Sequence, residues 1–262
     1  MREFPLLDQP RVRRLLFYPR RDFSAEPAVQ GARCVSVEVE TGVKIVCRFY
    51  PAGKENPSIL YFHGNGETAG DYDYIAPEYT SRGINFFVAD YRGYGLSDGE
   101  PSVSAMINDA HPIFAAFKEF LEKEGYKFSL FVMGRSLGSA PAIELASCYQ
   151  DELQGLIIES GFANSIRLLS YLGILSLDPA LEAESGIGNA VKIRSVVLPT
   201  LIIHAEFDTL VPLQEGRELF ENAGAEEKKL FVVPNADHNT IMLVGGARYF
   251  DEIASFVRAH SR

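Results

Sequence analysis

A serine in a glycine-flanked turn is the first feature of this sequence that could do chemistry. The pentapeptide Gly-Arg-Ser-Leu-Gly occupies residues 134–138 and centres on Ser136. It follows an apolar run and precedes a helical pattern, which is the setting of a nucleophile elbow. Glycine on both sides removes side chains that would clash with the strand and helix of so sharp a turn. The pattern predicts Ser136 as the nucleophile of an acyl transfer.

An imidazole and a carboxylate that could activate this serine follow in the order Ser, Asp, His. Serine is a poor nucleophile at neutral pH, so it needs a base to take its proton and an acid to orient that base. Asp208 and His238 each follow an apolar run. Both therefore lie beyond the carboxyl end of a predicted parallel strand, where such sheets place their ligands. We predict His238 as the base and Asp208 as the orienting acid.

Structural roles compete with these assignments. Taken alone, His238 could be a surface loop histidine, and Asp208 could cap a helix that follows Pro212. Asp237 adjoins the candidate base and is interpreted as a turn residue. The order of the three catalytic candidates, and their places after strands, favour catalysis.

A glycine-containing loop at 63–66 could supply hydrogen-bond donors to the oxyanion. It reads His-Gly-Asn-Gly and directly follows an apolar run. We predict the backbone N–H groups of Asn65 and Leu137 as the two donors. His63 itself is interpreted as a structural loop residue, and Asp90 and Arg92 as scaffolding that positions neighbouring groups.

The elements that must position these residues are visible as alternating short apolar runs and longer amphipathic stretches. Short apolar runs are typical of parallel strands buried on both faces. A leading pair of alternating segments predicts a hairpin, so the fold is predicted as α/β, a mostly parallel, doubly wound sheet with an antiparallel N-terminal hairpin. The predicted strands are 33–40, 44–50, 58–62, 85–89, 128–133, 155–158, 200–204 and 230–233, and the predicted helices are 68–81, 103–124, 137–149, 213–223 and 247–259.

The segment 161–195 interrupts this alternation and is rich in apolar residues. We predict it to be a short helical lid inserted into one domain that spans residues 1–262. Its apolar content predicts a hydrophobic acyl group, and its short length favours a small or medium chain. The residues predicted to line the substrate pocket are Phe162, Leu168, Leu172 and Leu175.

Composition excludes several other kinds of function. A net charge of −10 disfavours binding to nucleic acid. Cys34, Cys47 and Cys148 have neither the number nor the spacing of a disulfide framework or zinc site, so they are interpreted as structural thiols. His111 and His204 have no nearby set of ligands at metal spacing. We therefore predict no metal and no cofactor, and a small-molecule acyl substrate as the partner.

The N-terminal region carries a basic stretch rather than a targeting signal. It lacks the apolar core of a signal peptide, and no apolar run approaches the roughly 20 residues of a membrane span. These features predict a cytoplasmic protein. We interpret the stretch as an arm lying on the domain and consider contact with a membrane surface the weaker alternative. Its basic residues are Arg11, Arg13, Arg14, Arg20 and Arg21.

With these motifs identified, the sequence resembles the α/β-hydrolase superfamily from about Val35 to His260. Four segments, 16–19, 63–66, 90–95 and 134–138, are together similar to the Bem46-like subgroup, which includes the ABHD17 and ABHD13 proteins. Eukaryotic relatives include acyl-protein thioesterases that remove palmitate. This chain departs from the family pattern at His204-Ala205, where His-Gly is usual. The resemblance implies an α/β-hydrolase fold and a serine hydrolase.

The predicted reaction is hydrolysis of a carboxylic ester through an acyl-enzyme on Ser136. The same three residues could cleave a thioester or an amide, and the sequence does not separate these substrates. A protein without activity that binds a small apolar ligand is the alternative from another class. The sequence leaves the oligomeric state open.

Overall fold

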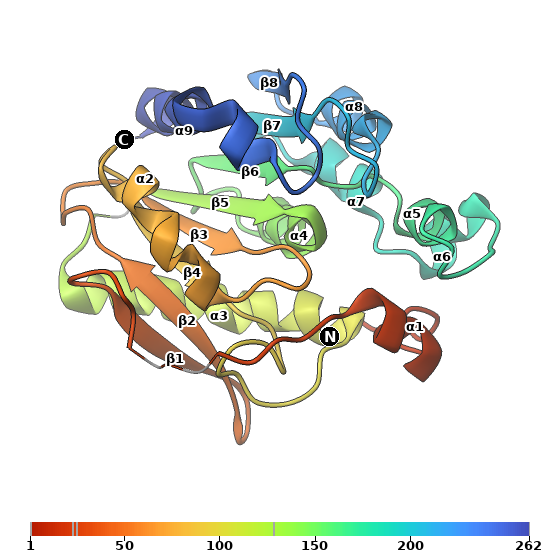
Figure 1. The fold of residues 1–262 in the computed structure, drawn as a ribbon, viewed down its shortest axis with the longest axis horizontal. Coiled ribbons are helices and arrows are strands. Elements are labelled where there is room, and N and C mark those ends of the chain that lie inside the picture. Colours follow the sequence, from red (N-terminus) through yellow and green to blue (C-terminus); the bar gives the residue numbers. More distant parts are fainter. Residues whose placement is uncertain (1, 23, 25, 128, 262) are drawn as a thin grey trace.

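The computed structural model describes residues 2–22, 24, 26–127 and 129–261, and these form a layered α/β fold (Figure 1). Its eight strands are β1 (Arg33–Glu40), β2 (Val43–Tyr50), β3 (Ser58–Phe62), β4 (Asn85–Ala89), β5 (Leu130–Arg135), β6 (Gly155–Glu159), β7 (Thr200–Ala205) and β8 (Lys228–Val233). They form one sheet in the order β1-β2-β4-β3-β5-β6-β7-β8. β2 is antiparallel to both β1 and β4, and every other pair is parallel. The prediction of a mostly parallel sheet with an antiparallel start is confirmed.

Helices cover both faces of this sheet, as expected for a doubly wound fold. One buried cluster joins the sheet to α3, α4 and α8, and the other joins it to α2 and α9. The α-helices are α1 (Pro10–Leu16), α2 (Ala76–Thr80), α3 (Val103–Glu124), α4 (Ser139–Cys148), α5 (Ser165–Tyr171), α6 (Glu182–Ser185), α7 (Asn189–Lys192), α8 (Leu213–Asn222) and α9 (Ile241–His260). The 3-10 helices are η1 (Ala69–Tyr74), η2 (Ser136–Gly138), η3 (Pro179–Leu181) and η4 (Ile193–Ser195).

Several predicted elements differ by one or two residues from those observed, and three differences bear on the sequence patterns. The helix predicted at 68–81 is divided into η1 and α2, because Pro77 lies at the start of α2 and cannot continue a helix from the preceding turn. The helix predicted at 247–259 begins earlier and bends at Gly246, whose φ is +51°. The strand predicted from Phe128 is observed from Leu130, and Phe128 lies outside the described residues.

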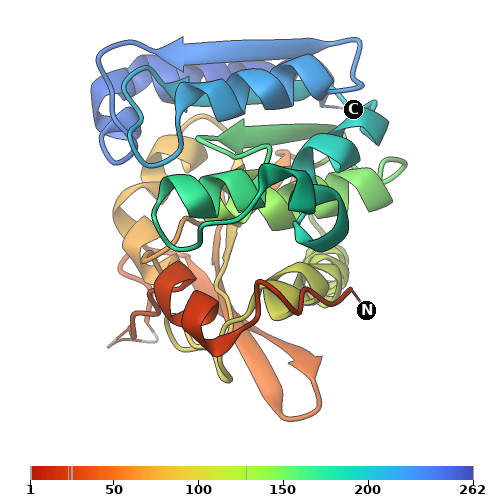
Figure 2. The ribbon, with the colours of Figure 1, turned by 90° about the vertical axis from the view of Figure 1, so that its right-hand side faces the viewer.

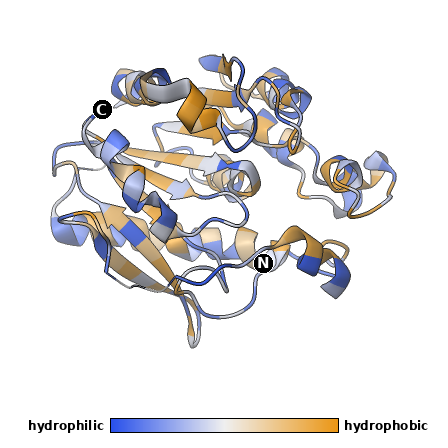
Figure 3. Cartoon of the chain, in the orientation of Figure 1, coloured by the Kyte–Doolittle hydropathy of each residue, from blue (hydrophilic) through white to orange (hydrophobic). Residues whose placement is uncertain are grey.

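Two helical segments lie at the edge of the molecule where the parallel strands end. The insertion 161–195 contains α5, α6 and α7, and α1 from the N-terminal region lies at the same edge (Figure 2). α1 was not predicted. Figure 3 shows hydrophobic residues along the central strands and also on α5 and α1. Within the described ranges, no helix is both long and apolar enough to cross a membrane.

Candidate active site

The predicted nucleophile stands on a strained turn between β5 and α4. β5 ends at Arg135, and Ser136 has a φ of +50°, in the left-handed region that non-glycine residues rarely adopt. A β-carbon added to Gly134 would lie 2.1 Å from the carbonyl oxygen of Gly138, and one added to Gly138 would lie 2.1 Å from that of Phe62. Both positions therefore require glycine, as the sequence pattern predicted.

The structure brings Ser136, His238 and Asp208 together. His238 Nε2 lies 3.0 Å from Ser136 Oγ, and His238 Nδ1 lies 2.7 Å from Asp208 Oδ2. The pairing of Ala205 with Val233 at the ends of β7 and β8 places the loops of the acid and the imidazole side by side. Because a carboxylate only accepts, Nδ1 carries the proton of the neutral ring, and Nε2 is free to accept from the serine hydroxyl.

The two carboxylate oxygens of Asp208 accept hydrogen bonds from different groups. Oδ2 accepts from His238, while Oδ1 accepts from the backbone N–H groups of Leu210 and Val211 at 3.0 and 2.8 Å. Burial raises the pKa of Asp208, but the bonds from His238 and Val211 outweigh that effect and hold the pKa below its usual value. Asp208 therefore holds the loop before α8 and contacts the imidazole, but it does not cap α8, whose N-cap is Pro212.

Asp237 is a turn residue, as interpreted from the sequence. Its Oδ1 accepts from the backbone N–H groups of Asn239 and Thr240, both at 2.9 Å. This carboxylate is exposed and accepts only from its own loop in these contacts, so it forms part of the turn that presents His238.

His204 supports the loop of Asp208, a role that sequence reasoning did not identify. It is fully buried, and its Nε2 lies 2.8 Å from the carbonyl oxygen of Val211, to which it donates. Burial lowers the pKa of His204 and so favours the neutral ring. The sequence places His204 at the end of a strand and in the family pattern, but its acceptor, the carbonyl of Val211, became visible only in the folded loop.

The predicted oxyanion donors lie beside the serine. Asn65 and Leu137 line the same cavity as Ser136 and His238. Pairing of β3 with β5 brings the loop after β3 next to the elbow. The N–H of Leu137 belongs to the first turn of η2, and such groups have no acceptor within their own helix.

The side chain of Asn65 bonds the loop 63–66, the predicted oxyanion loop, to the N-terminal region. Its Nδ2 donates to the carbonyl of Leu16 at 2.6 Å, and its Oδ1 accepts from the N–H of Tyr18 at 2.9 Å. The hydroxyl of Tyr94 donates to the same oxygen at 2.6 Å. The backbone of Asn65 is thus held by three bonds through its own side chain.

His63 and the loop after β4 have structural positions, in agreement with their interpretation. His63 is fully buried; its Nε2 lies 3.1 Å from Asp90 and its Nδ1 2.8 Å from the carbonyl of Gly64. Asp90 also accepts from the N–H of Ala69 at 2.7 Å. Arg92 forms ion pairs with the carboxylates of Glu40 and Asp109.

An apolar cavity of about 370 Å³ opens beside Ser136 and His238. The predicted residues Phe162, Leu168 and Leu172 line it, whereas Leu175 does not and packs against the core. The N-terminal region supplies an unpredicted wall of the cavity. The residues of that wall are Leu7, Leu15, Leu16 and Tyr18.

The basic N-terminal stretch is bound to the domain at three of its arginines. Arg13 pairs with Glu100, and Arg20 pairs with Asp71, both at 2.9 Å. Arg21 donates to the carbonyl of Ser97 at 2.7 Å.

Among the described residues, no group of three His, Cys, Asp or Glu side chains is arranged to hold a metal ion.

Comparison with known proteins identifies the family. A family model described as serine aminopeptidase S33 matches residues 53–175. The chain is 30% identical over 233 residues to protein bem46 of Schizosaccharomyces pombe, covering 84% of this chain and 75% of that protein. It is 32% identical over 193 residues to the lysophosphatidylserine lipase ABHD12 of Danio rerio, covering 67% of this chain and 49% of the lipase.

Solved structures agree with the fold. The Pyrococcus furiosus esterase Pf2001 superposes with a TM-score of 0.74 at 19% identity, over 94% of this chain and 99% of the esterase. Ferulic acid-bound Est1E from Butyrivibrio proteoclasticus gives a TM-score of 0.71 at 18% identity, over 86% and 99%. The fold is therefore shared with these structures, and the similarity to bem46 shows that the chain belongs to the α/β-hydrolase superfamily, in its Bem46-like subgroup.

Proposed function

We propose that this protein is a serine hydrolase that cleaves carboxylic esters, with Ser136 as nucleophile, His238 as base and Asp208 as orienting acid. The observation that carries the proposal is the continuous contact from Ser136 Oγ to His238 and on to Asp208, at 3.0 and 2.7 Å. This contact lies at an apolar cavity large enough for a small-molecule substrate.

The first step forms an acyl-enzyme. Ser136 Oγ attacks the ester carbonyl carbon while its proton passes to His238 Nε2, and the carbonyl electrons move to the oxygen. The N–H groups of Asn65 and Leu137 donate to that oxyanion. When the C=O bond re-forms, the C–O bond to the alcohol breaks, and the alcohol leaves with the proton from His238.

The second step releases the acid. A water molecule gives a proton to His238 Nε2 and attacks the acyl carbon, forming a second oxyanion at the same donors. Collapse of this intermediate breaks the bond to Ser136 Oγ, which recovers its proton from His238. Asp208 stays ionised and holds the imidazolium in both steps, which fits its lowered pKa.

The cavity supports an uncharged acyl group of small or medium length. Its lining is mainly leucine and isoleucine side chains, and its volume is near the lower end of the range for ligand pockets, roughly 300–1,000 Å³. Ester substrates are also consistent with the fold shared with Pf2001, which is named as an esterase.

Replacement of the nucleophile tests the proposal. We expect Ser136→Ala to abolish labelling by a fluorophosphonate probe and to lower ester turnover by about a millionfold, judged from other triads. Labelling on a gel and hydrolysis of an aryl butyrate measure the two effects. The control is Ser147→Ala in α4, whose hydroxyl donates to a backbone carbonyl of its own helix.

Two outcomes would contradict the proposal. If Ser136→Ala kept the turnover of the wild type, the hydrolysis would have another nucleophile. If the wild type bound an apolar ligand in the cavity but neither reacted with the probe nor hydrolysed esters, thioesters or amides, the protein would be a binding protein.

A further inference from the structure

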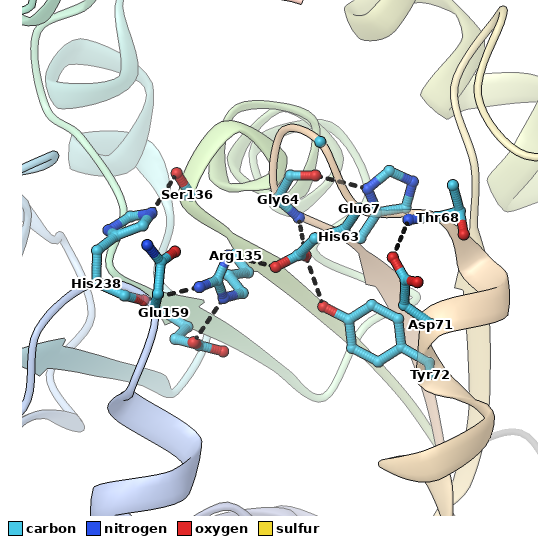
Figure 4. Close-up of polar contacts among 12 residues, drawn as sticks. His63, Gly64, Glu67, Thr68, Asp71, Tyr72, Arg135, Ser136, Glu159 and His238 are labelled. Carbon is cyan, nitrogen blue, oxygen red and sulfur yellow. Dashed lines mark hydrogen bonds and ion pairs between the residues drawn. The ribbon is translucent and has the colours of Figure 1, made fainter. Parts of the chain in front are cut away.

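The residue before the nucleophile carries a buried guanidinium that reaches three parts of the site. Arg135 is only 6% exposed. Its Nη2 donates to the backbone carbonyl of His238 at 2.7 Å, its Nε to Glu159 at 3.0 Å and its Nη1 to Glu67 at 2.6 Å (Figure 4). These acceptors come from the loop of the imidazole, the end of β6 and the segment after the oxyanion loop.

The contact with Glu159 ties the elbow to the helix that follows the imidazole. Arg135 and Glu159 are direct partners in the register of β5 and β6. The other oxygen of Glu159 accepts from the hydroxyl of Tyr249 in α9 at 2.6 Å. α9 begins three residues after His238, so Arg135 contacts the loop of His238 directly and the helix that follows it through Glu159.

The contact with Glu67 ties the elbow to the oxyanion loop. Glu67 Oε1 accepts from Arg135, and Oε2 accepts from the N–H of Gly64 at 2.7 Å and from the hydroxyl of Tyr72 at 2.9 Å. Gly64 precedes Asn65, one of the proposed donors. A β-carbon on Gly64 would lie 2.5 Å from Arg135 Nη1, so the loop rests directly on the guanidinium.

The charges explain why an arginine can be held here. Burial lowers the pKa of Arg135, but the carboxylates of Glu67 and Glu159 outweigh that effect and hold the pKa well above its ordinary value. A planar guanidinium presents five donors in fixed directions, which suits three acceptors on different segments. A lysine has one nitrogen and cannot reach all three groups with that geometry.

We propose that Arg135 is a positioning residue that fixes the distances among the nucleophile, the imidazole and the oxyanion donors. The proposal rests on the proposed hydrolase function. Arg135 sits directly before the nucleophile, bonds to the main chain of the base and, through Glu67, bonds to the main chain of the oxyanion loop. It therefore acts on the reaction through these groups.

Substitution of Arg135 should lower kcat while leaving KM nearly unchanged. Displacement of catalytic groups by about 1 Å can cost on the order of 100-fold in rate, so we expect Arg135→Met to lower kcat for an aryl butyrate by about 100-fold. Arg135→Lys keeps the charge and one contact, so we expect its kcat to be about tenfold higher than that of Arg135→Met. Arg135 is one of the residues that line the cavity, but most of the lining is apolar side chains, so KM should stay within about twofold of the wild type.

The matched control is Arg92→Lys. Arg92 also pairs with two carboxylates, Asp109 and Glu40, but does not line the cavity. Total fluorophosphonate labelling gives the amount of reactive serine in every preparation, so kcat is expressed per folded site. We expect Arg92→Lys to leave kcat per site unchanged. If it lowered kcat as much as Arg135→Lys, the effect would be general, and the proposal would be overturned.

A milder variant covers the case in which Arg135→Met does not fold. Glu67→Gln removes one carboxylate partner and leaves the arginine in place. We expect its kcat to fall by about tenfold and its KM to stay close to that of the wild type. Wild-type kcat in both Glu67→Gln and Arg135→Lys would overturn the proposal while Ser136→Ala still abolished turnover. If Ser136→Ala itself stayed active, the proposed function would fail instead.

Discussion

At the scale of single residues, Asp208 is the carboxylate that orients the imidazole in the proposed mechanism. Its Oδ2 accepts from the N–H at His238 Nδ1, and its Oδ1 accepts from the backbone N–H groups of Leu210 and Val211. In Asp208→Asn the amide oxygen can still accept from the loop, but the amide nitrogen would face the imidazole. We expect kcat to fall about 10⁴-fold, the size of effect known for this change in a serine protease. Steady-state hydrolysis of an aryl ester measures it.

Asp237→Asn is the control for this prediction, because Asp237 adjoins His238 and carries the same charge change. Its carboxylate accepts only from the turn of Asn239 and Thr240 in the contacts described above. We expect its kcat to match the wild type. Equal losses in both variants would mean that charge near the loop, rather than the bond to His238, is what matters.

The sequence was enough to predict the site residues that lie just after the ends of strands. Ser136, Asp208 and His238 each follow a parallel strand, so the rule that parallel strands end at one edge was enough to bring them together. The partners of Arg135 could not be found this way. Glu67 lies 68 positions away and the carbonyl of His238 lies 103 positions away, and neither pairing leaves a local pattern.

At the scale of elements, strand register positions the site and two helical segments enclose it. The long periodic helix at 103–124 was predicted with its observed bounds, because its buried stripe repeats over many turns. α1 has only seven residues and one fully buried side chain, Val12, so its pattern was too short to read. The part of the cavity wall that it forms, Leu15 and Leu16, was missed for the same reason.

The lining of the cavity should set the preference for acyl chain length. We expect Leu168→Ala to raise the ratio of kcat/KM for an octanoyl ester over that for a butyryl ester by about tenfold, because removing part of a side chain makes room for added methylenes. Leu168 lines the cavity beside Ser136. The two kcat/KM values, measured with the same aryl alcohol, check the prediction.

Leu175→Ala serves as the control, because Leu175 belongs to the same insertion and packs against the core without lining the cavity. Its chain-length ratio should equal that of the wild type. An unchanged ratio in Leu168→Ala, or a preference of the wild type for strongly charged acyl groups, would show that this cavity does not hold the acyl chain.

At the scale of the whole molecule, Glu144 joins three regions that are distant in the chain. It lies in α4, the helix behind the nucleophile, and its side chain is 3% exposed. Lys192 Nζ of the insertion lies 2.7 Å from Oε2, and Arg2 Nη1 of the N-terminal region lies 3.2 Å from the same oxygen. Burial raises the pKa of Glu144, but contacts with His111, Lys192 and Arg2 outweigh it and lower the pKa to about 2.

This lowered pKa predicts how stability depends on pH. The ordinary pKa of 4.5 applies to the unfolded chain, so the stabilisation from the Glu144 carboxylate is fully present above about pH 4.5 and is lost as the pH falls toward 2. We expect Glu144→Gln to be less stable than the wild type by about 3 kcal/mol at pH 7, because Lys192 loses its buried partner. This difference in the free energy of unfolding should become smaller between pH 5 and pH 3. The other carboxyl groups are common to both proteins, so their titration cancels in the difference. Urea unfolding at pH 7, 5 and 3 measures this difference.

Glu100→Gln is the control, at a carboxylate whose side chain is 84% exposed. Its free energy of unfolding should differ from that of the wild type by under about 1 kcal/mol at each pH. A gap for Glu144→Gln that stayed constant down to pH 3 would mean that its carboxylate is not the charged partner of Lys192.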